Sequence, residues 1–398
     1  MGLSCKSSLP SIYFSTIITI CSLYAAQPIQ PVFQQEFALS RPQAILFTTL
    51  MMMPLGVAPL FYGYLLETFS AKFLVRGAIL ALGVLEIIFS MAGSYLSLIL
   101  IRAIQGLMIP AILTSLMSYI SYSSSRENVQ HSIALYIAAT IMGGFLGRFL
   151  SGLFTDLFGW RMFFFVLGIL LLLAFFLLGC LERNVKLTYE RPNMHQVALL
   201  LREGRFRWLY LAIFCIFFVF SALMNFLPFE LKKINPAFRE AGIGLLYLGY
   251  SMGILVSVNT RRIIGYFGNE PDAIMAGIGI FFLGTTIFFV ENYQVMFIGM
   301  FVFCTGLFMA HSLLSGLVNK LSQDNKALAN GVYISFYYMG GTLGSFLPGV
   351  FFEHLGWRVF LLSLLIMLVL ALCFAGRLKH AVRLLPGPGV DQGLSKGA

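Results

Sequence analysis

Charged residues are scarce in this chain of 398 residues. Asp, Glu, Lys and Arg make up 11% of it, while hydrophobic residues make up 59%, whereas soluble domains carry about a quarter charged residues. This excludes an ordinary soluble globular protein. Apolar segments of about 20 residues recur from end to end, and each is long enough to cross a ~30 Å hydrocarbon layer as a helix. The sequence therefore predicts an all-α polytopic membrane protein.

Acidic residues are the scarcer charged class, with 16 Asp and Glu against 26 Lys and Arg and a formal net charge of +10. The basic residues lie mostly in short links between apolar segments, so we exclude nucleic acid as a partner. The six cysteines are scattered without metal-ligand spacing, and we interpret them as small buried residues. Their positions are Cys5, Cys21, Cys180, Cys215, Cys304 and Cys373.

Motifs of cofactor and enzyme chemistry are also missing. The chain has no phosphate-cradling Gly-x-x-x-x-Gly-Lys, which argues against ATP-driven transport, and it has no metal box or nucleophile triad. We therefore expect no enzyme activity, no cofactor and no metal.

One stretch of sequence occurs twice. Residues 136–163 align with residues 333–360 at a constant offset of 197, and fifteen of the 28 aligned positions are identical. Both copies carry Met-Gly-Gly near the start and end in Gly-Trp-Arg-x-Phe. The chain is therefore predicted to consist of two related halves.

Twelve spans are predicted, six in each half. Six is an even number, so the halves share one orientation and are parallel repeats about an axis along the membrane normal. The predicted spans are 11–31, 43–66, 73–93, 96–120, 132–154, 162–181, 208–230, 241–258, 273–291, 294–318, 328–352 and 359–377.

Lys and Arg in the links fix the orientation. Eighteen of the 26 fall on the side that holds both termini, six fall on the other side, and Arg102 and Arg148 fall inside spans. By the positive-inside rule, both termini are cytoplasmic. We expect a six-helix bundle over 1–181, a cytoplasmic linker over 182–207, a second bundle over 208–382 and a disordered tail over 383–398. Within the linker, Met194–Leu201 is amphipathic and predicts a helix on the inner membrane face.

Two six-helix halves resemble the major facilitator superfamily of secondary transporters over essentially the whole chain. Arg102, Gln105 and Gly106 match the family's R-x-x-Q-G signature at the start of span four. The stretches 308–316, 333–341 and 225–229 resemble the branch of drug- or sugar-efflux proteins. The resemblance implies alternating access, a small-molecule substrate and coupling to protons, and it ties Arg102 to proton coupling and packing.

Some positions depart from that family. The loop after span two usually reads G-x-x-x-D-x-x-G-R-K/R, and here Gly63, Glu67 and Lys72 are kept in kind while the second Gly and the Arg are lost. We interpret 63–72 as a gate hinge on the cytoplasmic face. The antiporter G-P-x-x-G-G pattern of span five is absent, because Arg148 follows Gly147 where Pro is expected. The direction of transport therefore stays open.

Arg148 is the sharpest functional signal. It lies about two thirds of the way along span five, with Gly144 and Gly152 on the same helix face. An Arg at membrane depth costs at least a few kcal/mol, so such residues are usually paired and functional. We interpret Arg148 as a cation that binds an anionic substrate group; the alternative is an internal ion pair holding two helices together. The glycine face of Gly144 and Gly152 is predicted to allow close helix approach, and Gly144 and Gly147 are predicted to take part in gating.

Glu86 in span three and Arg102 in span four form a second candidate pair. A fixed cation favours the ionised carboxylate, and separating the pair lets the carboxylate take a proton. The alternative is that Glu86 sits near the outer end of its helix in contact with water. Among the Asp and Glu residues, Glu86 is the only one that we place deep inside a predicted span.

Further polar residues are predicted to line the central site. Pro28 and Pro31 imply a kinked first span whose freed carbonyls need partners, and Pro228 is the matching feature in span seven. Interrupted helices at corresponding positions of two repeats indicate a midplane site. His311 is either a proton relay or a hydrogen-bonded packing residue. The remaining predicted lining residues are Gln27, Gln30, Asn225, Tyr333 and Tyr337, with Tyr338 beside them.

The two Gly-Trp-Arg ends are predicted to be mainly structural. Trp160 and Trp357 are expected at the outer headgroups. One turn earlier, Asp156 and Glu353 are expected as partners of Arg161 and Arg358, respectively.

From these features we expect a proton-coupled secondary transporter in the bacterial cytoplasmic membrane. Its substrate is predicted to be a small organic anion, such as a carboxylate metabolite or a siderophore-like compound. One alternative is efflux of lipophilic cations, which aromatic faces attract; another is a transport-inactive receptor or scaffold that docks partners through 194–201. We expect a monomer in the lipid bilayer.

Overall fold

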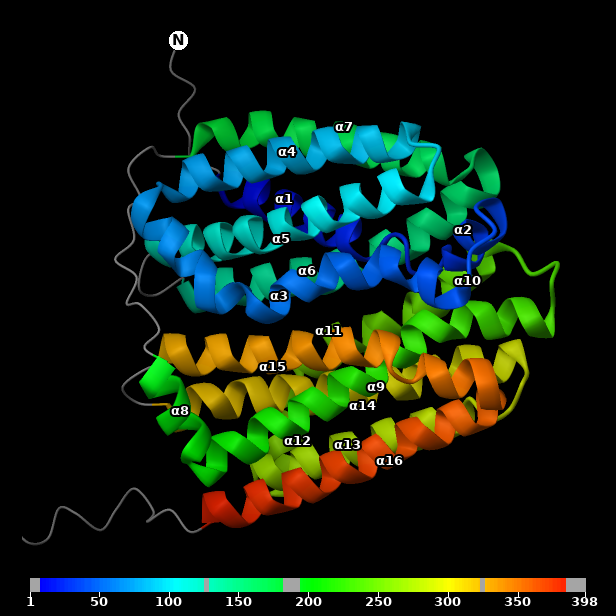
Figure 1. The fold of residues 1–398 in the computed structure, drawn as a ribbon. Helices are drawn as coiled ribbons and strands as arrows, with labels where there is room; N and C mark the ends of the chain where they lie inside the picture. The colour runs from blue at the N-terminus through cyan, green and yellow to red at the C-terminus, as the bar shows by residue number, and fades with distance from the viewer. Residues whose placement is uncertain (1–7, 125–128, 182–193, 323–325, 384–398) are drawn as a thin grey trace, which may run out of the picture.

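The computed structural model describes residues 8–124, 129–181, 194–322 and 326–383. All regular elements of these residues are helices, and they form two blocks (Figure 1). The first block contains α1 to α7 and the second α9 to α16, with α8 at the left-hand end of the molecule in this view. Predicted spans one to six therefore lie together, as do spans seven to twelve.

The first block consists of seven α-helices and one short 3-10 turn. The first predicted span is interrupted, since it is made of two separate helices. The elements are α1 Ser8–Tyr24, α2 Gln30–Glu36, α3 Arg41–Thr68, α4 Ala71–Met91, α5 Tyr95–Ser123, α6 Val129–Phe158, α7 Trp160–Leu177 and η1 Leu178–Cys180.

The second block follows α8 and has the same order of spans. Its second span passes from α10 through a 3-10 turn into α11, and α12 links it to the third. The elements are α8 Met194–Arg202, α9 Gly204–Ile234, α10 Glu240–Leu246, η2 Tyr247–Tyr250, α11 Ser251–Val258, α12 Thr260–Phe267, α13 Glu270–Ile287, α14 Tyr293–Leu321, α15 Lys326–Phe346 and α16 Gly349–Arg383.

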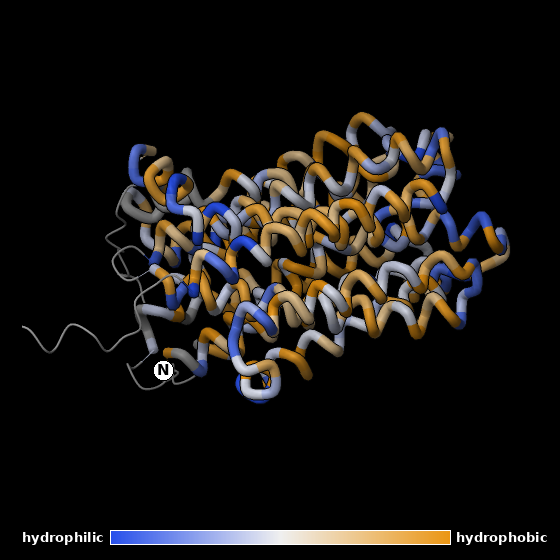
Figure 2. The backbone as a smooth tube through the Cα atoms, turned by 90° about the horizontal axis from the view of Figure 1, so that it is seen from below, coloured by the Kyte–Doolittle hydropathy of each residue, from blue (hydrophilic) through white to orange (hydrophobic). Residues whose placement is uncertain are grey.

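Nine helical segments among the described residues are long and apolar enough to cross a membrane. With α1, α3 and α15 they make up the twelve predicted spans. Hydrophobic residues occupy the middle of the molecule and hydrophilic residues gather at its two ends (Figure 2). The predicted fold of twelve spans, six in each half, is confirmed.

The sequence repeat reappears in the backbone. Gly159 and Gly356, which are 197 residues apart, both have positive φ values, of 83° and 80°. Each stands immediately before a tryptophan, where one span turns into the next. Left-handed backbone favours glycine because it has no Cβ. The matched glycines therefore reverse the chain in the same way in both halves.

The repeated glycines of spans five and eleven also make matched helix contacts. A Cβ at Gly147 would lie 2.6 Å from the Cα of Cys21, and one at Gly344 would lie 2.7 Å from the Cα of Phe218. Cys21 and Phe218 are themselves 197 residues apart. The first span of each half thus crosses the fifth at corresponding glycines, with backbone against backbone.

We expect Gly344→Ala to lower the free energy of unfolding by about 1–3 kcal/mol, because the added methyl group has to push rigid backbone apart. Gly316→Ala is the matched control, since a Cβ there has nothing within 4 Å. Thermal unfolding of the purified protein checks this. Equal melting temperatures for the two variants would contradict the close crossing.

The predictions for the two tryptophans, the amphipathic run, and the linker and tail have different outcomes. Trp160 and Trp357 are buried within their halves rather than exposed to headgroups, because their indole nitrogens donate to Glu36 at 2.6 Å and to the Phe288 carbonyl at 2.8 Å. The amphipathic run 194–201 is helical, as α8. Of the predicted linker and tail, residues 182–193 and 384–398 lie outside the described part of the chain.

Candidate functional site

The interruption of the first span carries Gln27. This residue lies between the end of α1 and the start of α2, and its backbone N–H bonds the Tyr24 carbonyl at 3.1 Å. Gln27 and Gln30 are both buried. The break therefore places two carboxamides inside the protein, close to the start of α2.

Span seven has a matching irregularity at Pro228, which lies inside α9. Proline has no backbone N–H, so the carbonyl four residues earlier, that of Met224, loses its usual helical partner. The Tyr247 hydroxyl donates to this carbonyl at 3.3 Å. Asn225 follows directly and is fully buried.

A continuous chain of hydrogen bonds joins these residues across the two halves. Arg148 Nε donates to Gln27 Oε1 at 2.6 Å, and Gln27 Nε2 donates to Asn225 Oδ1 at 2.9 Å. Asn225 Nδ2 then donates to Ser345 Oγ at 2.8 Å, and Ser345 shares a hydrogen bond of 2.7 Å with Ser221. We call Arg148, Gln27, Asn225 and Ser345 the central chain.

Ser345 is the counterpart of Arg148 at the repeat offset of 197. We did not predict Ser345 as a site residue. In the structure the two equivalent positions stand at opposite ends of the central chain. The site is therefore asymmetric, with a cation in the first half and neutral hydroxyl and amide groups in the second.

The Arg148 guanidinium is fully buried yet incompletely paired. Nη1 donates to the Gly144 carbonyl at 2.7 Å, while Nη2 has no hydrogen-bond partner. The ring centroids of Tyr24, Tyr250 and Tyr247 lie 3.9, 4.8 and 5.3 Å from its central carbon. No carboxylate pairs with Arg148 among the described residues, so the ion-pair alternative lacks a partner there.

Gln30 joins the same site through α9. Its Nε2 donates to Asn225 Oδ1 at 2.9 Å and to Thr48 Oγ1 at 3.0 Å, while its Oε1 has no partner. The site thus holds one unused donor, on Arg148, and one unused acceptor, on Gln30. Buried polar groups left unpaired are costly, and each needs an explanation.

His311 lies on α14 and belongs to a neighbouring aromatic cluster. The Tyr333 hydroxyl lies 2.9 Å from its Nδ1, and the Tyr337 ring centroid lies 4.9 Å from its own. These three predicted residues are together, but no hydrogen bond connects them to Arg148 in the structure as described. Both interpretations of His311, as a proton relay and as a packing residue, stay predictions.

Glu86 and Arg102 form a buried ion pair in the first half, with Glu86 Oε1 3.6 Å from Arg102 Nη1 and both side chains fully buried. The Ser22 hydroxyl donates to Glu86, and Arg102 Nη1 donates to Gln105 Oε1 at 3.1 Å. The predicted pairing is therefore present, and the exposed alternative for Glu86 is wrong. Glu230, in α9, is a second fully buried carboxylate that the sequence reading missed.

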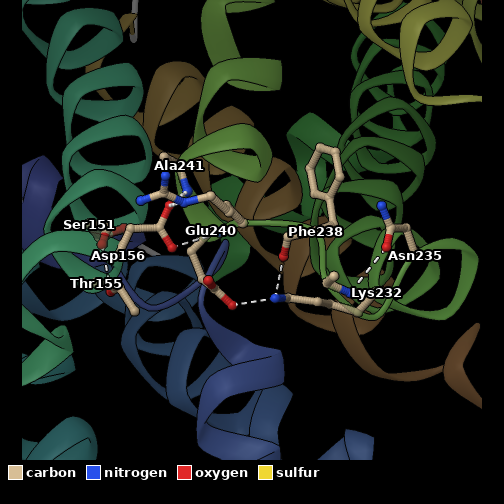
Figure 3. A network of polar contacts seen from close by, with 10 residues as sticks. Ser151, Thr155, Asp156, Lys232, Asn235, Phe238, Glu240 and Ala241 are labelled. Atoms are coloured by element: carbon tan, nitrogen blue, oxygen red, sulfur yellow. Dashed lines mark hydrogen bonds and ion pairs between the residues drawn. The ribbon is translucent and has the colours of Figure 1, made fainter.

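The outer ends of the halves meet in a polar seam (Figure 3). Asp156 of α6 accepts hydrogen bonds from the backbone N–H groups of Glu240 and Ala241, at 3.1 and 2.9 Å, where α10 begins. Arg239 Nε lies 3.3 Å from the same carboxylate, and Lys232 Nζ lies 2.6 Å from Glu240. We call these five residues the outer latch.

Two predicted ion pairs are wrong. Asp156 reaches across to the second half instead of pairing with Arg161, which binds Glu36 at 2.5 Å. Glu353 likewise binds Arg41 of the first half at 3.1 Å, and Arg358 lies 3.7 Å from Glu291. The expected partners were chosen because they are close in the sequence, whereas the observed ones come from packing between spans.

The predicted cytoplasmic gate is described only in part. Gly63 and Glu67 belong to the last turns of α3, and the Glu67 side chain lies outside the described ones. Lys72 donates to the carbonyls of Gly179, at 2.6 Å, and of Leu181, both within the first half. Gating by these residues stays a prediction.

A family model of the Major Facilitator Superfamily matches residues 12–270 and 240–393. The chain belongs to the Major Facilitator Superfamily. Relatives within that superfamily agree: the chain is 28% identical over 375 residues to "Inner membrane transport protein YnfM" of Escherichia coli K12, covering 93% of this chain and 90% of the relative. It is 26% identical over 383 residues to "Uncharacterized MFS-type transporter YybF" of Bacillus subtilis 168, covering 95% and 94%.

Solved structures show the same fold. The nucleoside transporter NupG superposes with a TM-score of 0.76 at 12% identity, covering 94% of this chain and 100% of that one. This superfamily member is thus a secondary transporter rather than an enzyme, in the bacterial inner membrane. The drug-efflux branch suggested by the sequence stays a prediction.

In this superfamily transporter, Asp156→Asn is expected to weaken the outer latch. An amide keeps one acceptor but turns its NH₂ toward the second backbone N–H, and it loses the attraction to Arg239. The free energy that favours the state closed at its outer end is expected to fall by about 1–3 kcal/mol. Ser151 is buried near the seam, so the labelling rate of a Ser151→Cys reporter is expected to rise by about tenfold or more. The label is a membrane-impermeant maleimide added from the outside.

Asp272→Asn is the matched control. Asp272 pairs with Lys379 and Arg383 inside the second half, so it does not join the halves. If both variants label Ser151→Cys at the wild-type rate, Asp156 does not hold the outer end closed.

Proposed function

We propose that this protein carries a small organic anion across the inner membrane by alternating access, with Arg148 as the anion-binding group. One observation supports this above the others. A fully buried guanidinium stands at the meeting of the two halves with Nη2 unpartnered and without a carboxylate partner in the described chain. Burying an unpaired charge is expensive, and an anionic substrate would complete the pairing.

The central chain supports a mechanism for alternating access. Gln27 links Arg148 to Asn225 of the other half. The guanidinium that is proposed to bind the substrate therefore also takes part in holding the two halves together. A substrate carboxylate at Arg148 would compete with Gln27 for the guanidinium. Binding would then loosen the central contact, and a ligand shifts a conformational equilibrium through such differential contacts.

Proton coupling is proposed for the Glu86–Arg102 pair. Both residues contact Ser22 of α1, which lies two residues before Tyr24 of the Arg148 site. Movement of α1 would therefore affect both sites. Separation of the pair would remove the cation that favours the ionised carboxylate, so that Glu86 takes up a proton.

The lipophilic-cation alternative fits this site less well. Cation carriers need a carboxylate where the substrate binds, whereas the central chain contains a cation and neutral groups. Glu86 is already paired with Arg102. A transport-inactive receptor or scaffold would not explain why Arg148 Nη2 is buried without a hydrogen-bond partner.

Transport by purified protein in proteoliposomes tests the proposal. Radiolabelled monocarboxylates, dicarboxylates and a lipophilic cation are supplied with and without an imposed pH gradient. The proposal expects carboxylate uptake that the gradient enhances and no uptake of the cation. Uptake of the cation alone would refute the anion assignment, and carboxylate uptake insensitive to the gradient would refute proton coupling.

A further inference from the structure

A groove on the surface of the second half lies between the start of α9 and the last turns of α16, at the left-hand end of the molecule in Figure 1. Its volume is about 560 Å³. The two helices meet beside it through Trp208 and Phe374, whose ring centroids lie 5.8 Å apart at an interplanar angle of 17°. We call it the α9–α16 groove. The residues that line it are Trp208, Cys373, Gly376, Arg377, His380 and Ala381.

Two guanidinium groups lie against Trp208 at this groove. The central carbons of Arg207 and Arg377 lie 4.6 and 4.7 Å from the centroid of its ring, and both side chains are exposed. Within the described part of the chain, neither guanidinium forms a hydrogen bond or an ion pair. The ring therefore positions both cations through cation–π contacts, while their N–H donors stay free for a ligand.

Two carboxylates border this region, and both are already paired. Glu203, immediately before α9, lies 2.7 Å from Arg205. Asp272 of α13 binds Lys379 and Arg383 of α16. The positive charge of the two guanidinium groups at Trp208 is therefore uncompensated, which favours an anionic ligand.

One face of α16 changes from apolar to cationic where it reaches the groove. Ile366 is 63% and Leu370 is 41% exposed, and Cys373 is exposed as well. Spacings of three and four residues place side chains on one helix face. The residues that follow one another at these spacings are Ile366, Leu370, Cys373, Arg377 and His380. An exposed apolar stripe therefore leads along the helix to the cationic end of the groove.

The groove stands at the expected depth of the lipid headgroups. Predicted span seven begins at Trp208, and predicted span twelve ends at Arg377. Aromatic and basic side chains are typical of this boundary, and the positive-inside rule assigns this end to the cytoplasm. Basic pockets between spans on that side are suited to anionic lipid headgroups.

We propose that the α9–α16 groove binds an acidic phospholipid of the inner leaflet, such as one with a phosphatidylglycerol headgroup. Its phosphate binds the guanidinium groups of Arg207 and Arg377, whose paired N–H donors match phosphate oxygens. One acyl chain lies along Ile366 and Leu370. This apolar stripe is the reason for assigning a lipid rather than a free phosphate.

The inference does not depend on which solute the protein carries. The groove is lined by α9 and α16 of the second half, whereas the central chain joins the two halves. A ligand that binds only the folded state stabilises it. Loss of this lipid is therefore expected to lower thermal stability without changing the rate of transport.

Native mass spectrometry of the delipidated full chain tests the proposal, with dioleoyl phosphatidylglycerol, dioleoyl phosphatidylcholine and inorganic phosphate as probes. The two lipids have the same acyl chains but differ in net charge. We expect phosphatidylglycerol to bind about tenfold or more tightly than phosphatidylcholine, since each Lys or Arg near an anionic lipid surface contributes about fivefold in affinity. Phosphate alone is expected not to displace it, because phosphate makes no contact with the apolar stripe.

Arginine variants locate the binding. Arg207→Gln and Arg377→Gln are each expected to reduce the preference for phosphatidylglycerol about fivefold, and the double variant is expected to lose most of it. Arg262→Gln is the matched control, because it removes an exposed arginine of α12 whose Nη1 lies 3.4 Å from Asn259. This control is expected to keep the preference. Thermal unfolding without lipid shows that the variants are folded.

Each contrary outcome would overturn the assignment. Equal binding of the two lipids would show that the groove does not recognise the anionic headgroup. Displacement of phosphatidylglycerol by phosphate would show an anion site instead of a lipid site. If the double variant keeps the preference, or if Arg262→Gln loses it equally, the lipid binds elsewhere. None of these results bears on the proposed transport of an anion, which the proteoliposome assay tests separately.

Discussion

Replacing Arg148 by Ala is expected to lower the rate of anion transport at least about 100-fold. Charge-assisted hydrogen bonds contribute about 1.5–3 kcal/mol each, and a carboxylate on a guanidinium usually forms two of them. The variant loses the proposed anchor and leaves Gln27 Oε1 without its donor at 2.6 Å. Uptake of labelled anion in proteoliposomes measures the effect.

Arg148→Lys and Arg377→Ala complete this experiment. Lysine keeps the charge but cannot reproduce the planar fork, so an intermediate rate is expected. Arg377 lies over Trp208, away from the central chain, and its removal is expected to leave the rate within about twofold of wild type, as for surface substitutions generally. A wild-type rate for Arg148→Ala would remove Arg148 from the substrate path.

Replacing Glu86 by Gln is expected both to destabilise the first half and to abolish proton-driven accumulation. Arg102 would stay fully buried without its counter-charge at 3.6 Å, and breaking a buried pair from one side costs about 3–5 kcal/mol. The variant also has no carboxylate to take up a proton. Downhill exchange of labelled for unlabelled substrate, which needs no net proton movement, is expected to persist.

A double variant separates stability from coupling. Glu86→Gln combined with Arg102→Gln removes both charges, so most of the lost stability is expected to return, as a double-mutant cycle of thermal unfolding would show. Gradient-driven accumulation is expected to stay absent. If the double variant is stable and still accumulates substrate against a pH gradient, Glu86 and Arg102 do not couple protons.

Much of the fold could be predicted because the membrane restricts the choices. Spans have to be apolar helices of a minimum length, and the repeat of residues 136–163 at 333–360 indicated two equivalent halves. Glu86 and Arg102 could be paired in advance, since few charges lie inside spans and each needs a partner. The glycine contacts of Gly147 and Gly344 follow from the same repeat.

The contacts that sequence reading missed have no local pattern in the sequence. Asp156 binds backbone N–H groups about 84 residues away, and backbone donors have no residue type that marks them. Ser345 was overlooked because a serine on an apolar helix is usually bonded to its own backbone, as Ser345 also is to Gly341. Its link to Asn225 depends on how the halves meet.

The most direct test of the central claim is a structure of the protein with a bound carboxylate substrate, measuring the distance from the carboxylate to Arg148 Nη2. The account predicts a hydrogen bond, about 2.7–3.0 Å long, with the ligand between the two halves. A substrate bound elsewhere while Nη2 stays unpartnered would contradict it.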